Sequence, residues 1–80
     1  MARIHPPELS DLIVADPEVV GGQPCFRGTR IPVAVLFDNL ADGMPLDAIL
    51  EQWPSLDRAD VAAVLALAGE AAARHAGRAA

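Results

Sequence analysis

Prolines and glycines divide this chain into short segments and limit the length of most elements that it can form. Pro32 suits the first position of a helix, where its missing N–H costs nothing, and Gly43 supplies a helix stop. Pro45 can open a second helix in the same way, and Pro54 disfavours helical geometry at the residue before it. The sequence therefore predicts two short helices, the second of barely two turns.

Apolar residues recur at spacings of three and four in both segments, as on the buried face of a helix. They are Val33, Leu36, Phe37 and Leu40, then Leu46, Ile49, Leu50 and Trp53. Asp57 is a good N-cap for a third, longer helix, and Asp60 follows at the spacing of a capping box. Its buried stripe would be Val61, Val64, Leu65 and Ala68. An alanine face would let a neighbour approach closely: Ala62, Ala63, Ala66, Ala71, Ala72 and Ala73.

The first part of the chain predicts short extended pieces. The apolar run 12–15 ends at Asp16, Gly21 and Gly22 form a break, and residues 25–31 read as a tight turn between two strands. Residues 1–11 predict a flexible or partner-dependent arm, and residues 77–80 a frayed tail beyond a helix stop at Gly77. The expected fold is one mainly α domain over 12–76, a three-helix helix-turn-helix bundle preceded by a short strand or hairpin.

Eighty residues provide one modest core, near the lower limit for folding alone, so we expect a homodimer or a stabilising partner. A lone Cys25 fits a reducing compartment and excludes an internal disulfide or zinc knuckle. No run is apolar enough for a membrane span or signal peptide, so the expected location is cytoplasmic. His5 and His75 lack ligand spacing, so no metal and no cofactor is expected.

The net charge of −5 disfavours strong phosphate binding, which depends on basic side chains that displace counterions. The helical part, residues 33–80, holds three arginines against seven acidic residues. Arg58 could contact guanine in a recognition helix, but Asp57 and Asp60 would repel the DNA backbone, so a bracing helix is the preferred interpretation. Nucleic-acid binding would need local arginines or a second chain.

Arg27 and Arg30 flank Gly28 and could present two guanidinium groups to phosphates or to a carboxylate cluster. Alternatively, they pair with Asp38 or Asp42 and hold the turn in place. The candidate residues for binding a partner or nucleic acid are Arg27, Arg30, Arg58, Arg74 and Arg78. Those expected to serve turn geometry are Gly21, Gly22, Gly28 and Pro32. With no nucleophile–base pair, metal set or cofactor loop, we do not expect an enzyme.

Residues 21–33 read GGQPCFRGTRIPV, and the later segments Asp42-Gly43-Met44 and Trp53-Pro54-Ser55-Leu56 complete the pattern. This pattern resembles a short prokaryotic family of VapB-like antitoxins, long catalogued as a domain of unknown function, with the signature GGxPxxRGTRIPV. The resemblance covers residues 13–68 and departs from the family at Gln23 and Pro45. It implies a homeodomain-like or winged-helix-like fold and a PIN-like ribonuclease toxin as partner, with operator DNA as a further one.

The resulting hypothesis is an antitoxin that dimerises, or docks on its toxin, through its strand segment and alanine face, and covers the toxin's active site. An arginine would pair with metal-binding carboxylates of the nuclease; the candidates are Arg27, Arg30, Arg74 and Arg78. Two alternatives stay open. One is a stand-alone DNA-binding regulator, and the other is a structural dimerisation module fused or bound to larger proteins.

Overall fold

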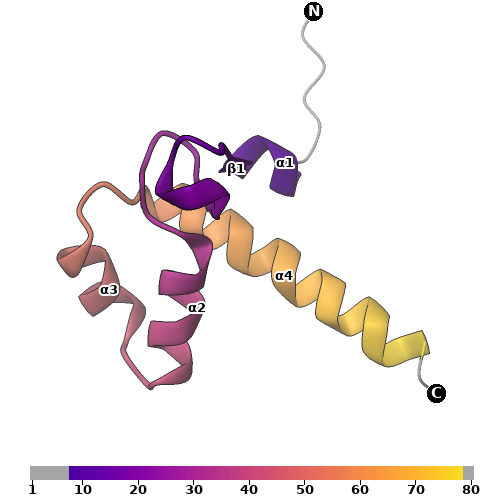
Figure 1. Cartoon of the computed structure of the whole chain (residues 1–80). Helices are drawn as coiled ribbons and strands as arrows, with labels where there is room; N and C mark the ends of the chain where they lie inside the picture. The colour runs from indigo at the N-terminus through magenta and orange to yellow at the C-terminus, as the bar shows by residue number, and fades with distance from the viewer. Residues whose placement is uncertain (1–7, 79–80) are drawn as a thin grey trace, which may run out of the picture.

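A computed structural model describes residues 8–78 of the chain, and within them a β-hairpin precedes a group of helices (Figure 1). The elements are α1 (Leu9–Leu12), β1 (Ile13–Ala15), the 3₁₀ turn η1 (Val20–Gly22), β2 (Pro24–Phe26), α2 (Val33–Ala41), α3 (Leu46–Gln52) and α4 (Arg58–Arg78). The prediction of a mainly helical fold preceded by a short hairpin is confirmed. None of the described helices is both long and apolar enough to cross a membrane.

The hairpin pairs β1 with β2 in antiparallel register, with Ile13 opposite Phe26 and Val14 opposite Cys25. Because side chains alternate between the faces of a strand, Phe26 enters the core while Val14 lies on the other face, 48% exposed. The connection between the strands passes through three successive residues with positive φ, at Val20 (+50°), Gly21 (+64°) and Gly22 (+86°). Two glycines meet this left-handed geometry without strain, whereas the β-branched Val20 does not.

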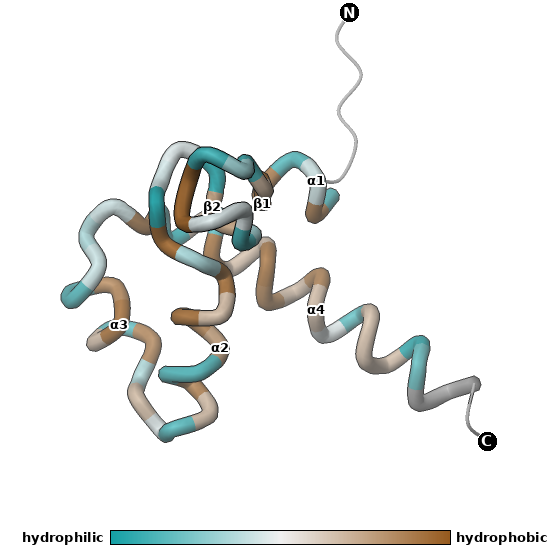
Figure 2. Tube along the Cα trace, viewed as in Figure 1, coloured by the Kyte–Doolittle hydropathy of each residue, from teal (hydrophilic) through white to brown (hydrophobic). Residues whose placement is uncertain are grey.

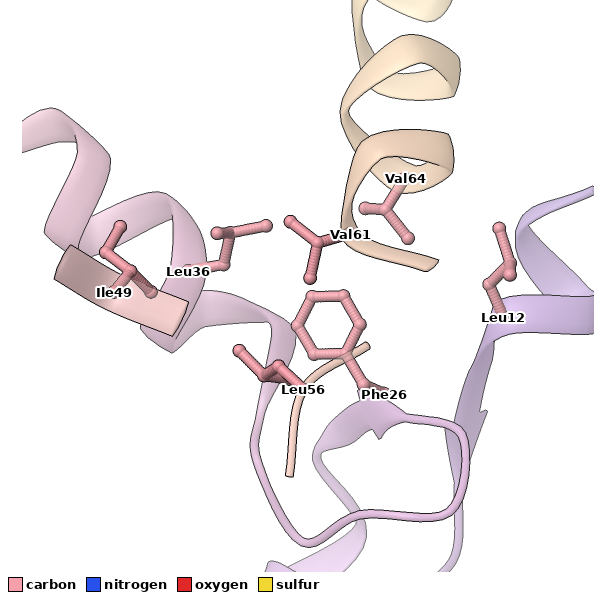
Figure 3. Packing of buried hydrophobic residues seen from close by; sticks show 7 residues of the cluster. All are labelled: Leu12, Phe26, Leu36, Ile49, Leu56, Val61 and Val64. Atoms are coloured by element: carbon pink, nitrogen blue, oxygen red, sulfur yellow. The ribbon is translucent and has the colours of Figure 1, made fainter. Parts of the chain in front are cut away.

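The core is a single cluster to which the hairpin and every helix of the bundle contribute (Figure 3). Its buried side chains are Leu12, Phe26, Leu36, Ile49, Leu56, Val61 and Val64. The Phe26 ring lies among the side chains of α4 and of the loop that precedes it. The predicted stripes of α2, α3 and α4 supply four of these seven residues, and the hairpin side supplies Leu12 and Phe26. Phe37 was expected on the buried stripe of α2, and that expectation is wrong: its side chain is 37% exposed.

The helix ends follow the local chemistry of the sequence. After α2 the backbone N–H of Gly43 donates to Leu40 O (3.0 Å) and that of Met44 to Asn39 O (2.9 Å), and Gly43 has φ +93°. This pair of bonds is a Schellman C-cap. At the start of α4, Asp57 Oδ1 accepts from the backbone N–H of Ala59 (2.7 Å) and of Asp60 (3.2 Å), so the predicted N-cap is confirmed.

Several boundaries differ from those expected. The predicted arm 1–11 overlaps α1, a single turn held by a bond from Glu8 N–H to Asp11 Oδ2 (3.0 Å) and by the contact of α1 with α4. One turn is too short to produce a helical period in the sequence. Helix α4 passes through Gly77 and ends at Arg78, because a glycine in a long helix need not stop it. Residues 1–7, which include His5, and residues 79–80 of the predicted tail lie outside the described residues.

Candidate functional site

The Arg-Gly-Thr-Arg segment forms a tight turn that several short-range hydrogen bonds close. Thr29 N–H donates to Phe26 O (3.0 Å), and Gly28, with φ +78°, occupies the position of the turn that requires a positive φ. The Thr29 hydroxyl donates to the same carbonyl (2.8 Å) and accepts from Ile31 N–H (3.0 Å). Phe26 N–H in turn donates to Ile31 O (3.1 Å), so the turn is held rigidly against the core.

Arg27 is engaged by its own chain. Its guanidinium donates to Asp11 O at 2.5 Å, and another guanidinium nitrogen lies 3.7 Å from Asp60 Oδ1. The side chain therefore links the turn to α1 and to the first turn of α4. The geometry supports the alternative that Arg27 braces the fold. The expected acidic partners, Asp38 of α2 and Asp42 at its C-terminal end, are wrong, because the ion pair is with Asp60.

Arg30 has a different environment, although only two residues separate it from Arg27. Ile31, the next residue, packs against the core, whereas the Arg30 side chain is exposed. Within residues 8–78 it makes no ion pair of its own. Arg30 therefore provides a positive charge just before the N-terminus of α2, and this charge is available to another molecule.

Arg58, the one candidate for reading a base, pairs with Asp47 of α3 in this structure. Both side chains are largely exposed, so the pair contributes little to stability. Asp57 and Asp60 lie on either side of Arg58, and the first turn of α4 is acidic as a whole. An acidic first turn repels a phosphate backbone, and this geometry is better suited to joining α3 with α4 than to entering a DNA groove.

The distal half of α4 extends away from the body of the molecule (Figures 1 and 2). Its last buried residue is Val64, a few residues beyond it pack at the edge of the core, and all of residues 69–75, including Arg74, are exposed. Arg78 is the final residue of the helix. Of the predicted alanine face, Ala63 packs against the core, whereas the exposed members are Ala62, Ala66, Ala71, Ala72 and Ala73.

The outward face of α2 is a second exposed surface, which the sequence pattern concealed. Ala34, Phe37, Asp38 and Ala41 are all exposed and are spaced so that they share one side of the helix. Phe37 satisfies the same spacing rule as the buried residues of α2, so the sequence carries no signal that would separate it from them. This surface is defined here as the α2 face.

A small cavity of about 200 Å³ lies on the face of the hairpin that carries Val14 and Cys25. Its lining is mainly apolar: Val14, Asp16, Val19, Cys25, Phe26, Gly28 and Thr29. The thiol of Cys25 is buried and donates to Gln23 O (3.4 Å). Among residues 8–78, no group of three His, Cys, Asp or Glu side chains is placed to hold a metal ion.

Comparison with known proteins identifies the family but not an activity. An uncharacterized protein of Sinorhizobium fredii (strain NBRC 101917 / NGR234), y4eO, is 40% identical over 47 residues, which are 59% of this chain and 21% of that protein. The match therefore spans about a fifth of the relative's length. No solved structure is significantly similar. The family model described as "Protein of unknown function (DUF433)" matches residues 13–68, which include the hairpin, the turn and the core of the helices, and the chain belongs to this family.

Proposed function

We propose that this chain is the antitoxin of a type II toxin–antitoxin system and that it binds and neutralises a PIN-like ribonuclease toxin in the cytoplasm. The class of partner comes from the sequence resemblance described above. The observation that supports a protein-binding role is the distal half of α4, in which residues 69–75 are all exposed and stand clear of the rest of the molecule.

Packing against the rest of its own chain contributes little to the stability of such a helical segment. Isolated helices of this length are marginal in water, and most helical stability in proteins comes from packing. Alanine side chains lose almost no conformational entropy when a partner covers them, so an exposed alanine-rich helix loses little on docking. The exposed residues Ala71, Ala72 and Ala73 belong to this segment. Docking on a larger protein would bury it.

Arg74 provides the charge that the proposed inhibition needs. It is exposed on the distal half of α4, where it can extend into a cleft of the partner. A PIN-like nuclease holds its metal ions with carboxylates, and a guanidinium pairs with carboxylates in a planar, bidentate geometry. Arg27 is less suited to this role because Asp11 O and Asp60 already engage it.

The experiment is co-expression of the chain with the product of the adjacent gene. We expect the two proteins to copurify and the chain to restore the growth of cells that the toxin arrests. Arg74→Glu should weaken the complex at least about tenfold, which is the range of one buried charge contact. Arg58→Ala is the matched control, because Arg58 already pairs with Asp47, and it should leave the affinity unchanged. Absence of both copurification and rescue would refute the proposal.

The relative from Sinorhizobium fredii favours a second candidate function, an interaction module of larger proteins. The region similar to this chain makes up 21% of that protein, so in the relative the domain accompanies a much longer chain. Operator binding, the remaining alternative, has less support because Arg58 is paired and the chain carries a charge of −5. A gel-shift assay of the pure chain with its own promoter tests operator binding. Shifts at low salt that high salt abolishes would favour the DNA-binding regulator.

A further inference from the structure

The α2 face combines an exposed aromatic ring with small neighbours. Phe37 is 37% exposed, and among the described residues it is the one large apolar side chain of the helices α2 to α4 that is more than a third exposed. Ala34 and Ala41 lie one turn before and one turn after it on the same side of the helix. An exposed ring between two alanines is an apolar strip that another surface can cover without steric obstruction.

The charges at the two ends of this strip have opposite signs. Arg30, exposed and without an ion pair among residues 8–78, precedes the N-terminal end. Asp38 lies beside the strip, and Asp42 follows its C-terminal end; both are exposed. Arg30 therefore precedes the apolar strip, whereas the acidic residues Asp38 and Asp42 lie beside its middle and beyond its C-terminal end.

We propose that the α2 face is the contact of a two-fold symmetric dimer of this chain. In an isologous contact the same surface occurs on both subunits, so residue i meets residue j and residue j meets residue i. With two α2 helices antiparallel, Arg30 of each subunit faces Asp42 of the other, and the two Phe37 rings lie near the two-fold axis. Residue 36, the midpoint in sequence between positions 30 and 42, is next to Phe37.

The charge pattern selects a second copy over other occupants. A uniformly basic partner would pair with Asp38 and Asp42 but would be repelled by Arg30, and an acidic partner would meet the reverse conflict. A second copy of the same surface, turned through 180°, pairs Arg30 with Asp42 at both ends of the contact. Stacking of the two aromatic rings adds to the area that is buried at the centre.

This dimer is independent of the proposed toxin complex, because the α2 face and the distal half of α4 are different surfaces. One face of a short helix buries less area than a standard protein interface, so we expect a dissociation constant of ~1–100 μM. The contact would therefore be dynamic, and it must be measured on concentrated protein.

Sedimentation equilibrium of the pure chain, up to several hundred μM, tests the proposal. The expected mass rises to twice that of the monomer as the concentration increases. Phe37→Asp should leave a monomer throughout this range, because it places two like charges at the axis. Val14→Asp, at the still more exposed Val14 of the hairpin, is the matched control and should dimerise like the unmodified chain. Circular dichroism of each variant confirms that the helices are intact.

Charge exchange tests the antiparallel register itself. Arg30→Glu and Asp42→Arg should each weaken the dimer about tenfold, equivalent to about 1.4 kcal/mol, and the double variant should recover most of the loss. A monomeric wild-type chain at all concentrations, or a dimer that Phe37→Asp leaves intact, would overturn the proposal. If the losses of dimer affinity in the two single variants simply added in the double variant, this register would be excluded.

Discussion

At the scale of single residues, two arginines of one short turn make different contacts. Arg27 reaches back to Asp11 O and to Asp60, whereas Arg30 is exposed and makes no ion pair within residues 8–78. Their separation depends on Gly28, whose φ of +78° reverses the chain between them. The Thr29 hydroxyl then secures the reversal by bonding on both sides of the turn. The turn of residues 27–30 therefore places two arginine side chains in different environments.

The cost of Gly28→Ala should come from the backbone alone. A Cβ at this position would meet no atom within 4 Å, so there is no steric clash with neighbours. The left-handed conformation nevertheless costs an alanine about 1–2 kcal/mol relative to glycine. We expect the free energy of unfolding in urea to fall by about that amount.

Gly69→Ala is the matched control for this prediction. Gly69 also has open space around it but lies inside α4 with ordinary helical φ, so alanine should stabilise the chain by up to about 1 kcal/mol. If the two substitutions changed stability by the same amount and in the same direction, the backbone explanation of Gly28 would be wrong.

At the scale of elements, α4 has two parts with different support. Its first turns carry an N-cap at Asp57, the buried Val61 and Val64, and the contact with α1. Beyond residue 68 the helix is exposed on all sides in the described residues 69–75. The short helices α2 and α3 contact each other, α2 also contacts β2, and each helix places a buried residue in the core, Leu36 and Ile49. The distal half of α4 is the element with least tertiary support.

Native-state hydrogen exchange should divide α4 at this point. Amides of residues 61–68 open only with the core and should exchange slowly, while those of residues 70–75 should exchange at least about 100-fold faster, because local opening there breaks no packing. Addition of a bound toxin should slow the distal amides specifically. Uniform protection along the whole helix in the isolated chain would contradict the division.

At the scale of the whole molecule, a small core determines stability. Seven buried side chains form the single cluster, and a chain of 80 residues buries a limited share of its surface. The chain carries a net charge of −5, which opposes nonspecific binding to nucleic acid. Both properties are consistent with a domain that works in contact with other protein surfaces.

Ile49→Ala should remove much of this stability. Ile49 is 0% exposed and joins α3 to the core, and a buried Ile→Ala change costs about 2–5 kcal/mol. Total stabilities of small domains are about 5–15 kcal/mol, so the thermal midpoint should fall sharply. Leu9→Ala, at a side chain that is 41% exposed, should change it by only a small amount. Similar losses at both positions would show that the cluster is not the main source of stability.

The sequence by itself determined the mainly helical class, a short hairpin ahead of the helices and most helix ends, although it assigned residues 25–31 to a turn and the structure has Cys25 and Phe26 in strand β2. These features rest on interactions within a few residues: prolines before α2 and α3, the C-cap at Gly43 and the N-cap at Asp57. The motif of residues 21–33 also indicated a family catalogued as a domain of unknown function, and the family model that matches residues 13–68 confirms that part of the prediction. The single turn α1 escaped prediction, since four residues cannot display a period.

Only the tertiary structure decided which residues meet across distant parts of the chain. Periodicity placed Phe37 with the buried residues of α2, but the other elements dock on the side where Leu36 lies and leave Phe37 outside. Likewise, Arg27 selects Asp60 over Asp38 or Asp42 because α4, rather than the end of α2, lies within reach of the turn. Local patterns define the elements, but the docking of those elements determines which side chains remain for a partner.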